Sequence, residues 1–203
     1  MGRFPQLLLV LFFGTLLHAQ EQPHVTQMDL SQQISVGVGA VITRKTTVNG
    51  VKFEPTSAGA YEASYRYRIL RHLSAQVDYD FFMNAQKYLA SGQQTAIRSQ
   101  VHVLTGSAVF TFGTPFSKRM ESFISVGGGA LVYVPRDANG LAKQTINQFS
   151  IGGGDDFLLT HKVRIRAEVK GLTYKAPDFG FASIRTNKYV NTVIPTLGVV
   201  YSF

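Results

Sequence analysis

The chain of 203 residues contains no cysteine and no tryptophan. Without cysteine it has no disulfide framework, no thiolate nucleophile and no cysteine-ligated metal site. Beyond residue 19 it also lacks a run of about 18 apolar residues, the length that a membrane-spanning helix needs. The chain is instead supplied with 19 glycines, 9 tyrosines and 15 phenylalanines. Glycine and aromatic residues together, with few signals for helix starts, favour an all-β protein.

The first 19 residues have the pattern of a secretory signal peptide. Arg3 supplies a positive charge, Leu7 to Leu17 is almost uninterrupted apolar sequence, and Ala19 is a small residue before a polar flank. This order of charge, apolar segment and small residue is typical of a cleaved export signal. An uncleaved N-terminal anchor is the alternative. We therefore expect the chain to be exported.

Apolar and polar side chains alternate with a period of two, which is the pattern of β-strands with two different faces. The alternation is clearest in one segment, where one face carries Val163, Ile165, Ala167 and Val169 and the other carries Arg164, Arg166, Glu168 and Lys170. It recurs over 33–42, 61–68, 73–81 and 192–203, and less regularly over 99–113, 120–134 and 147–159. Glycine triplets at 127–129 and 152–154 blur the two faces of the last two segments. The pattern predicts eight strands, most of them with the ~9–11 residues that a tilted membrane strand needs.

The connections between these strands alternate in length. Short ones are expected near 69–72, 114–119 and 159–162, and long ones near 44–57, 84–98, 135–146 and 175–188. A transmembrane barrel has short periplasmic turns and longer outer loops in the same alternation. The long connections are therefore predicted to lie on the outer side, and both termini on the periplasmic side.

Aromatic residues gather on the apolar face where several strands end at one rim. They are Tyr65, Tyr67, Phe110, Phe112, Phe157, Tyr201 and Phe203. An aromatic girdle at a membrane interface has this arrangement. The alternative is the ordinary preference of aromatic residues for strands.

The polar face carries equal numbers of bases and acids. The bases are Arg66, Arg68, Arg164, Arg166 and Lys170, and the acids are Glu62, Asp78, Asp80, Asp156 and Glu168. Eight strands enclose an interior that side chains nearly fill, and buried charges must be paired. We predict that these ten side chains form an ion network in the lumen. The alternative is the solvated outer face of a soluble barrel.

At this point the chain resembles the small outer-membrane barrels of the OmpA/OmpX type over residues 33–203. The last residues, Gly198-Val199-Val200-Tyr201-Ser202-Phe203, resemble the signal by which the barrel-assembly machinery recognises its substrates. The stretch from Val169 to Phe179 is also similar to strand-and-loop segments of such barrels. The resemblance implies an eight-stranded antiparallel up-and-down transmembrane β-barrel in the outer membrane of a Gram-negative bacterium. It gives three segments: a signal peptide (1–19), an N-terminal periplasmic tail (20–32) and the barrel (33–203), with no peptidoglycan-binding domain.

Few residues suggest catalysis. Lipid A deacylases resemble this scaffold and carry a His-x-Ser-Asn element, and the nearest match is His72-Leu73-Ser74-Ala75. The asparagine is absent and the segment falls at a predicted periplasmic turn, although that chemistry belongs near the outer leaflet. The histidines are scattered, so no metal signature appears. We expect no enzymatic activity, no cofactor and no metal, and keep a lipid A-modifying enzyme as an alternative.

The long connections are strongly basic. Their bases are Arg44, Lys45, Lys52, Lys87, Arg98, Arg136, Lys143, Lys175, Arg185 and Lys188, and their acids are Glu54, Asp137 and Asp178. Ten bases minus three acids give a charge of +7. Each base near an anionic leaflet contributes roughly 1 kcal/mol of attraction, so we expect contact with the phosphates of lipopolysaccharide. A generically basic loop set is the alternative, and nucleic acid is a poor partner for an exported chain whose bases are spread over separate loops.

These features predict a monomeric outer-membrane protein with a structural, adhesion or surface-interaction role. A narrow channel for ions or small solutes is a second possibility, if the lumen charges leave a hydrated path. A soluble ligand-carrying barrel of the lipocalin kind is a third, but the early Gly-x-Trp of that family is absent because the chain has no tryptophan.

Overall fold

The computed structural model describes residues 32–48, 50–90, 93–113, 119–136, 141–181, 185 and 187–203. The predicted signal peptide and all of the predicted tail except Gln32 lie outside these residues, as do Asp137 and most of the predicted turn at 114–119. In the part of the chain that is described, no helix is long and apolar enough to cross a membrane.

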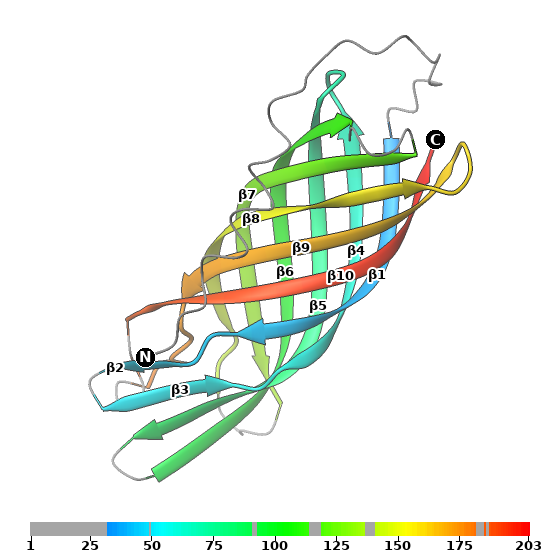
Figure 1. Ribbon diagram of the computed structural model, residues 1–203. Coiled ribbons are helices and arrows are strands. Elements are labelled where there is room, and N and C mark those ends of the chain that lie inside the picture. The colour runs from blue at the N-terminus through cyan, green and yellow to red at the C-terminus, as the bar shows by residue number, and fades with distance from the viewer. Residues whose placement is uncertain are drawn as a thin grey trace, which may run out of the picture.

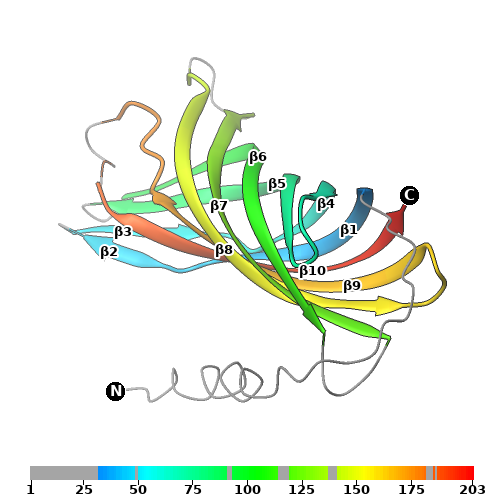
Figure 2. The ribbon, with the colours of Figure 1, turned by 90° about the horizontal axis from the view of Figure 1, so that it is seen from above.

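The described residues form ten β-strands. They are β1 (Gln32–Thr43), β2 (Thr46–Val48), β3 (Val51–Pro55), β4 (Ala58–Arg68), β5 (Leu73–Ala90), β6 (Gln93–Gly113), β7 (Met120–Pro135), β8 (Gln144–Leu158), β9 (Val163–Lys175) and β10 (Tyr189–Ser202). Eight of them, β1 and β4 to β10, are antiparallel neighbours in order, and β1 pairs with β10 to close the sheet (Figures 1 and 2). The predicted eight-stranded antiparallel β-barrel is confirmed.

The alternation of the sequence becomes an alternation of burial. In β1, Ile34, Val36 and Val38 are exposed, whereas Gln33 and Ser35 are buried. In β9, Arg164, Arg166, Glu168 and Lys170 are all buried, whereas Val169 is 52 % exposed. Because successive side chains point to opposite faces of a strand, the polar face lies inside and the apolar face outside. A water-soluble barrel would have the reverse arrangement.

The two ends of the barrel differ. At the end that we call the turn end, the Ile69 N–H donates to Leu73 O at 2.9 Å and the Leu159 N–H donates to Val163 O at 3.0 Å, which closes two of the three predicted short turns. The C-terminus lies at the same end, since Phe203 and Gln32 exchange backbone hydrogen bonds (Figure 1). The opposite end, which we call the loop end, carries the longer connections.

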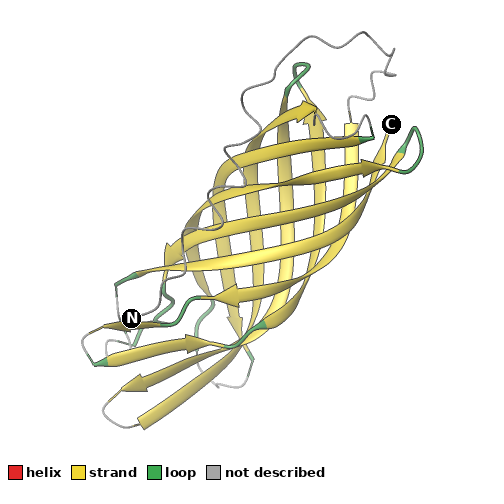
Figure 3. Cartoon of the chain, in the orientation of Figure 1, coloured by secondary structure: helices red, strands yellow, loops and turns green. Residues whose placement is uncertain are grey.

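Two of the predicted long loops are wrong, because they consist largely of strands (Figure 3). The segment 84–98 continues β5 and β6 beyond the barrel as a paired hairpin, and 44–57 contains β2 and β3, of which β3 pairs with β5. The reason is that period-two alternation does not stop at residue 81: Phe82, Asn84, Gln86 and Tyr88 continue the buried face of β5. The loop end therefore projects a four-stranded ribbon, in the order β2-β3-β5-β6.

The interior has two different halves. Near the turn end it is filled by charged side chains from the predicted set and also by amide side chains, which were not predicted. Towards the loop end it is filled by apolar ones, among them Val101, Val103, Leu131, Leu172 and Ile194, each at most 1 % exposed. The prediction that ionic side chains fill the centre is therefore right for the turn half only. In the loop half, most inward positions of β6, β7, β9 and β10 carry aliphatic and aromatic residues, with Ser99 and Thr192 as buried polar exceptions.

The glycine triplets mark a crowded wall. Gly127 and Gly129 share the inward parity of Phe123 and Leu131 in β7, and Gly154 shares that of Asp156 in β8. A Cβ at Gly129 would overlap the carbonyl oxygen of Leu104 on β6. Glycine permits this close approach of neighbouring strands because it lacks a side chain.

Candidate functional site

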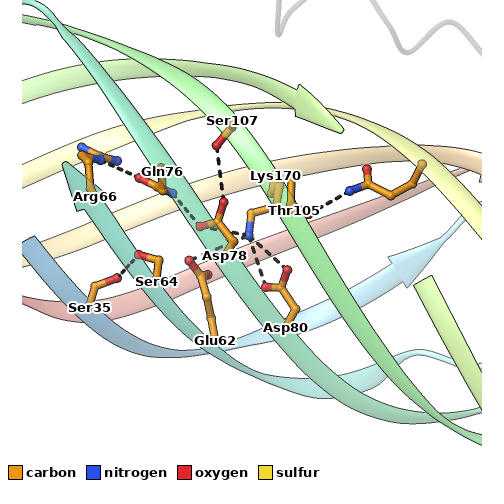
Figure 4. Close-up of polar contacts among 11 residues, drawn as sticks. Ser35, Glu62, Ser64, Arg66, Gln76, Asp78, Asp80, Thr105, Ser107 and Lys170 are labelled. Atoms are coloured by element: carbon orange, nitrogen blue, oxygen red, sulfur yellow. Dashed lines mark hydrogen bonds and ion pairs between the residues drawn. The ribbon is translucent and has the colours of Figure 1, made fainter. Parts of the chain in front are cut away.

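The lumen network is centred on Lys170 of β9. Its Nζ lies 3.1 Å from Asp80 Oδ2, 3.8 Å from Asp78 Oδ1 and 3.8 Å from Glu62 Oε1 (Figure 4). The three acids come from β4 and β5, so this lysine crosses the lumen to the opposite wall. Glu168 precedes it on the same inward face of β9 and is also buried. A buried ammonium surrounded by carboxylates ties the two walls of the barrel together.

A relay of amide and guanidinium groups extends the network towards the turn end. Arg66 Nε donates to Gln76 Oε1 at 2.5 Å, and Gln76 Nε2 donates to Asp78 Oδ1 at 2.6 Å (Figure 4). Gln76 thus links an arginine on β4 to the carboxylate that faces Lys170. Hydrogen bonds to ionised groups are stronger than those between neutral groups, so the relay fixes the side chains at its two ends.

Arg66 and Arg166 both contact the carboxylate of Asp156 and the ring of Phe123. Arg166 grips Asp156 with Nε to Oδ1 at 2.7 Å and Nη2 to Oδ2 at 2.8 Å, and Arg66 Nη1 lies 3.8 Å from Asp156 Oδ2. The ring of Phe123 on β7 lies 4.4 Å from Arg66 Cζ and 4.9 Å from Arg166 Cζ. The carboxylate and the aromatic faces offset the repulsion between the two guanidinium groups.

Nine of the ten predicted network residues are buried in the lumen. The exception is Arg68, which is half-buried at the turn end and forms no ion pair with the described residues. Sequence reasoning missed Gln76, Phe123 and Glu121, whose Oε2 lies 3.2 Å from Arg164 Nη1. The inward parity of Gln76 in β5 could have found it, but the blurred alternation of the glycine-rich strand hid Phe123 and Glu121.

An aromatic plug fills the lumen at the loop end, made by Phe53, Tyr88, Tyr133, Tyr174 and Phe179. The ring centroids of Tyr133 and Phe179 are 6.1 Å apart in an edge-to-face contact, and those of Phe53 and Tyr88 are 5.2 Å apart. Phe179 comes from the connection after β9, has a φ of 48° and is only 6 % exposed. Backbone in this left-handed region is costly for a residue with a bulky side chain, so tertiary contacts must hold Phe179 in place.

Those contacts are hydrogen bonds to the plug segment 176–181. The side chain of Gln144 accepts from the Phe179 N–H at 2.9 Å, and Tyr88 Oη donates to Pro177 O at 2.6 Å. Burial of Asp178 would raise the pKa of its carboxyl, but hydrogen bonds from the Gly180 N–H and from Arg185 outweigh it and hold that pKa below its usual value. Hydrogen bonds to β8 and β5 thus hold the segment 176–181 at the loop end of the lumen.

The residues considered for catalysis do not assemble. Ser74 points into the lumen and is buried, whereas the exposed His72 places Nδ1 3.0 Å from the backbone oxygen of Thr111. On the outer wall, His102 Nδ1 lies 2.7 Å from Tyr79 Oη, which satisfies the imidazole where it faces away from the lumen. Among the described residues there is no group of three or more side chains that could hold a metal ion.

The predicted girdle residues all lie on the outer face near the turn end. Tyr65, Tyr67, Phe110, Phe157, Tyr201 and Phe203 are exposed, and Phe112 is half-exposed. Phe110 packs against Phe112, and Tyr201 stacks on Phe203 at a ring distance of 6.2 Å. The aromatic rings therefore follow one rim of the barrel.

The ten predicted basic residues all lie at the loop end, where we call them the basic collar. Lys52 and Lys87 are half-buried and the other eight are exposed. Acids offset only part of this charge: Glu54 lies 2.8 Å from Lys45 and 3.2 Å from Lys52, and Asp178 lies 2.7 Å from Arg185. The hydrogen bonds from Lys45 and then Lys52 hold the pKa of Glu54 below its ordinary value.

Comparison with solved structures adds the class of fold. The chain is similar to neisserial surface protein A, with 14 % identity, a TM-score of 0.62, and coverage of 85 % of this chain and 97 % of that one. The chain has the fold of the small outer-membrane β-barrels. The outer membrane protein OprG from Pseudomonas aeruginosa (11 % identity, TM-score 0.61, 85 % and 96 % coverage) and Ail, the attachment invasion locus protein of Yersinia pestis (12 %, 0.51, 85 % and 99 %), are similar in the same way. No protein-family model matches the sequence, and neither does any curated protein.

Proposed function

We propose that this chain is an outer-membrane surface protein whose basic collar binds the phosphates of lipopolysaccharide, and that it is not a pore. The observation that carries the proposal is the position of the charge. Ten bases gather at the loop end, whereas the wall between the collar and the turn end is apolar. A cationic surface directly beside an apolar wall is complementary to an anionic lipid headgroup above its acyl chains.

The outer wall supports placement in a membrane. On β5 the outward side chains from Leu73 to Met83 include Val77 and Tyr79, and all four are exposed. This stretch matches the ~9–11 residues of a tilted membrane strand. The aromatic girdle then marks the periplasmic interface, and the collar lies at the level of the outer headgroups.

The filled lumen argues against the channel alternative. An ion crossing the barrel would have to displace the contacts of Lys170 with three carboxylates and then pass the aromatic plug. We therefore expect planar bilayers containing the protein to show no steady conductance above the leak of the bare bilayer. Reproducible single-channel steps would favour a narrow channel instead.

The enzyme alternative has less support. A nucleophile needs a base within hydrogen-bond reach. Ser74 is buried on the lumen side, whereas the exposed His72 ring lies 6.0 Å from the outward-facing ring of Phe110. We expect lipid A from cells with and without the protein to have the same acylation pattern.

The binding proposal is tested with detergent-solubilised protein over immobilised lipopolysaccharide. Replacing Lys52, Lys87 and Lys143 by Gln removes three collar charges, and the matched control replaces Arg71, Arg119 and Lys162, three bases at the turn end. At roughly 1 kcal/mol per base, the collar variant should bind up to about 100-fold more weakly, whereas the control should bind as the parent does. Equal affinities for the collar variant and the parent would remove the proposal.

A further inference from the structure

A cleft opens in the outer wall where β1 and β10 part. The Arg44 N–H still donates to Asn191 O at 2.9 Å, but beyond this bond the chain turns into β2, which pairs with β3. The space left between β2 and the start of β10 is a cleft of about 330 Å³. Polar side chains that line it are Arg44, Lys45, Thr46, Thr47, Lys188 and Asn191.

The cleft faces outward, directly beyond the apolar wall. In β10, Val190 and Thr192 are buried, so Asn191 and Tyr189 point out with Val193. Val193 pairs with Ile42 of β1, and these two side chains are 42 % and 54 % exposed. One step further along each strand the wall changes from apolar residues to Arg44 and Asn191. The cleft therefore lies where acyl chains would end and headgroups begin.

Charge and hydrogen-bonding capacity define what the cleft accepts. Three bases line it, Arg44, Lys45 and Lys188; Lys45 is paired with Glu54 at 2.8 Å, and no carboxylate is among the described lining residues. Threonine hydroxyls and a side-chain amide add neutral hydrogen-bond donors, a set that suits a phosphate oxygen. Tyr189 is exposed at the rim with Lys175 Nζ 5.9 Å from its ring centroid, which is the position of an interfacial aromatic residue.

We propose that this cleft binds the phosphate of one outer-leaflet glycolipid, whose acyl chains lie against Ile42 and Val193. The proposal rests on the proposed function, because it takes the loop end to be at the outer leaflet. The proposed function concerns attraction by the whole collar, whereas this proposal assigns one lipid molecule to one defined cleft. The ligand class is a phosphorylated, acylated saccharide.

The test is native mass spectrometry of the full chain in detergent after incubation with diphosphorylated lipid A. Wild-type protein should retain one lipid, and Arg44→Gln with Lys188→Gln should reduce the retained fraction about tenfold or more. The matched control, Arg71→Gln with Lys162→Gln, removes the same charge from exposed positions at the turn end, outside both the collar and the cleft, and should retain the lipid as wild type does. Dephosphorylated lipid A should not be retained, and equimolar inorganic phosphate should not displace the bound lipid.

Several results would overturn the site. They are unchanged retention by the cleft variant, equal loss in the control pair, retention of dephosphorylated lipid A, and displacement by inorganic phosphate, which would assign the cleft to a free anion. Each of these is independent of the lipopolysaccharide assay with the Lys52, Lys87 and Lys143 variant. If the Lys52, Lys87 and Lys143 variant loses lipopolysaccharide binding while the cleft variant keeps its lipid, the collar proposal is supported and the cleft site is refuted. If the parent protein binds no lipopolysaccharide at all, the proposed function itself is refuted.

Discussion

Lys170→Met tests how much the lumen ion network contributes to the free energy of unfolding. Lys170 is 2 % exposed, and its ammonium group lies within 4 Å of Asp80, Asp78 and Glu62. Methionine has a similar length and no charge, so the change leaves buried carboxylates without their counter-ion while causing little steric disturbance. Removing one partner of a buried ion pair costs about 3–5 kcal/mol. We expect a loss of free energy of unfolding in that range.

The assay is urea unfolding in phospholipid vesicles, followed by far-UV circular dichroism because the chain has no tryptophan to report fluorescence. Lys143→Met, at an exposed position outside the lumen, is the control and should cost less than about 0.5 kcal/mol. Adding Asp80→Asn to Lys170→Met should recover part of the loss, since neighbouring sites couple. A loss below 1 kcal/mol for Lys170→Met, or no recovery in the double variant, would refute the view that this lysine neutralises the acidic wall.

Three further predictions concern other parts of the barrel. Gly129→Val should prevent folding, read as loss of the shift in gel mobility on heating, because a Cβ there would overlap Leu104 O. Gly106→Val should fold, since a Cβ at that position would have nothing within 4 Å. Normal folding of both variants would contradict the close approach of β6 and β7 at Gly129. Phe123→Leu removes the ring between Arg66 and Arg166 and should lower the free energy of unfolding by about 1–2 kcal/mol; an unchanged urea midpoint would show that the ring does not matter. The lowered pKa of Asp178 means that its charge stabilises the plug segment above the unfolded pKa of ~3.9 and that this contribution is lost as pH falls through the lower folded value. The protection factors of the Phe179 and Gly180 amides, relative to the unfolded chain at the same pH, should therefore fall only below about pH 4, and protection factors that stay constant down to about pH 2 would contradict this.

The barrel could be predicted because one physical constraint acts along most of its length. Each spanning strand meets two different environments, and the alternation in 163–170 and 33–42 records this. The same parity located Asp80, Arg166 and Lys170 in the lumen. Their partners were not determined, because the sequence does not give the stagger of the strands, which sets Lys170 opposite Asp80.

The loop end was predicted less well, for two physical reasons. A membrane strand needs only ~9–11 residues, so the length expected for β5 ends near residue 82, whereas the alternation continues through Phe82 to Tyr88 and forms a ribbon beyond the apolar wall. Phe179 reaches the lumen from a connection. Its left-handed backbone is held by the hydrogen bond from its N–H to Gln144 and, two residues earlier, by the hydrogen bond from Tyr88 to Pro177 O. Such contacts join segments that are far apart in the sequence, so no local sequence pattern predicts them.

The orientation of the two faces is tested most directly on β10 by site-directed fluorescence in lipid. The chain has no native cysteine, so Leu197→Cys, Val199→Cys and Ser202→Cys each give one labelling site, the first two exposed on the outer wall and the third buried inside. A quencher dissolved in the acyl chains should strongly quench labels at 197 and 199 and leave the label at 202 bright. Strong quenching at 202 together with bright, water-accessible labels at 197 and 199 would contradict an apolar outer wall around a charged lumen.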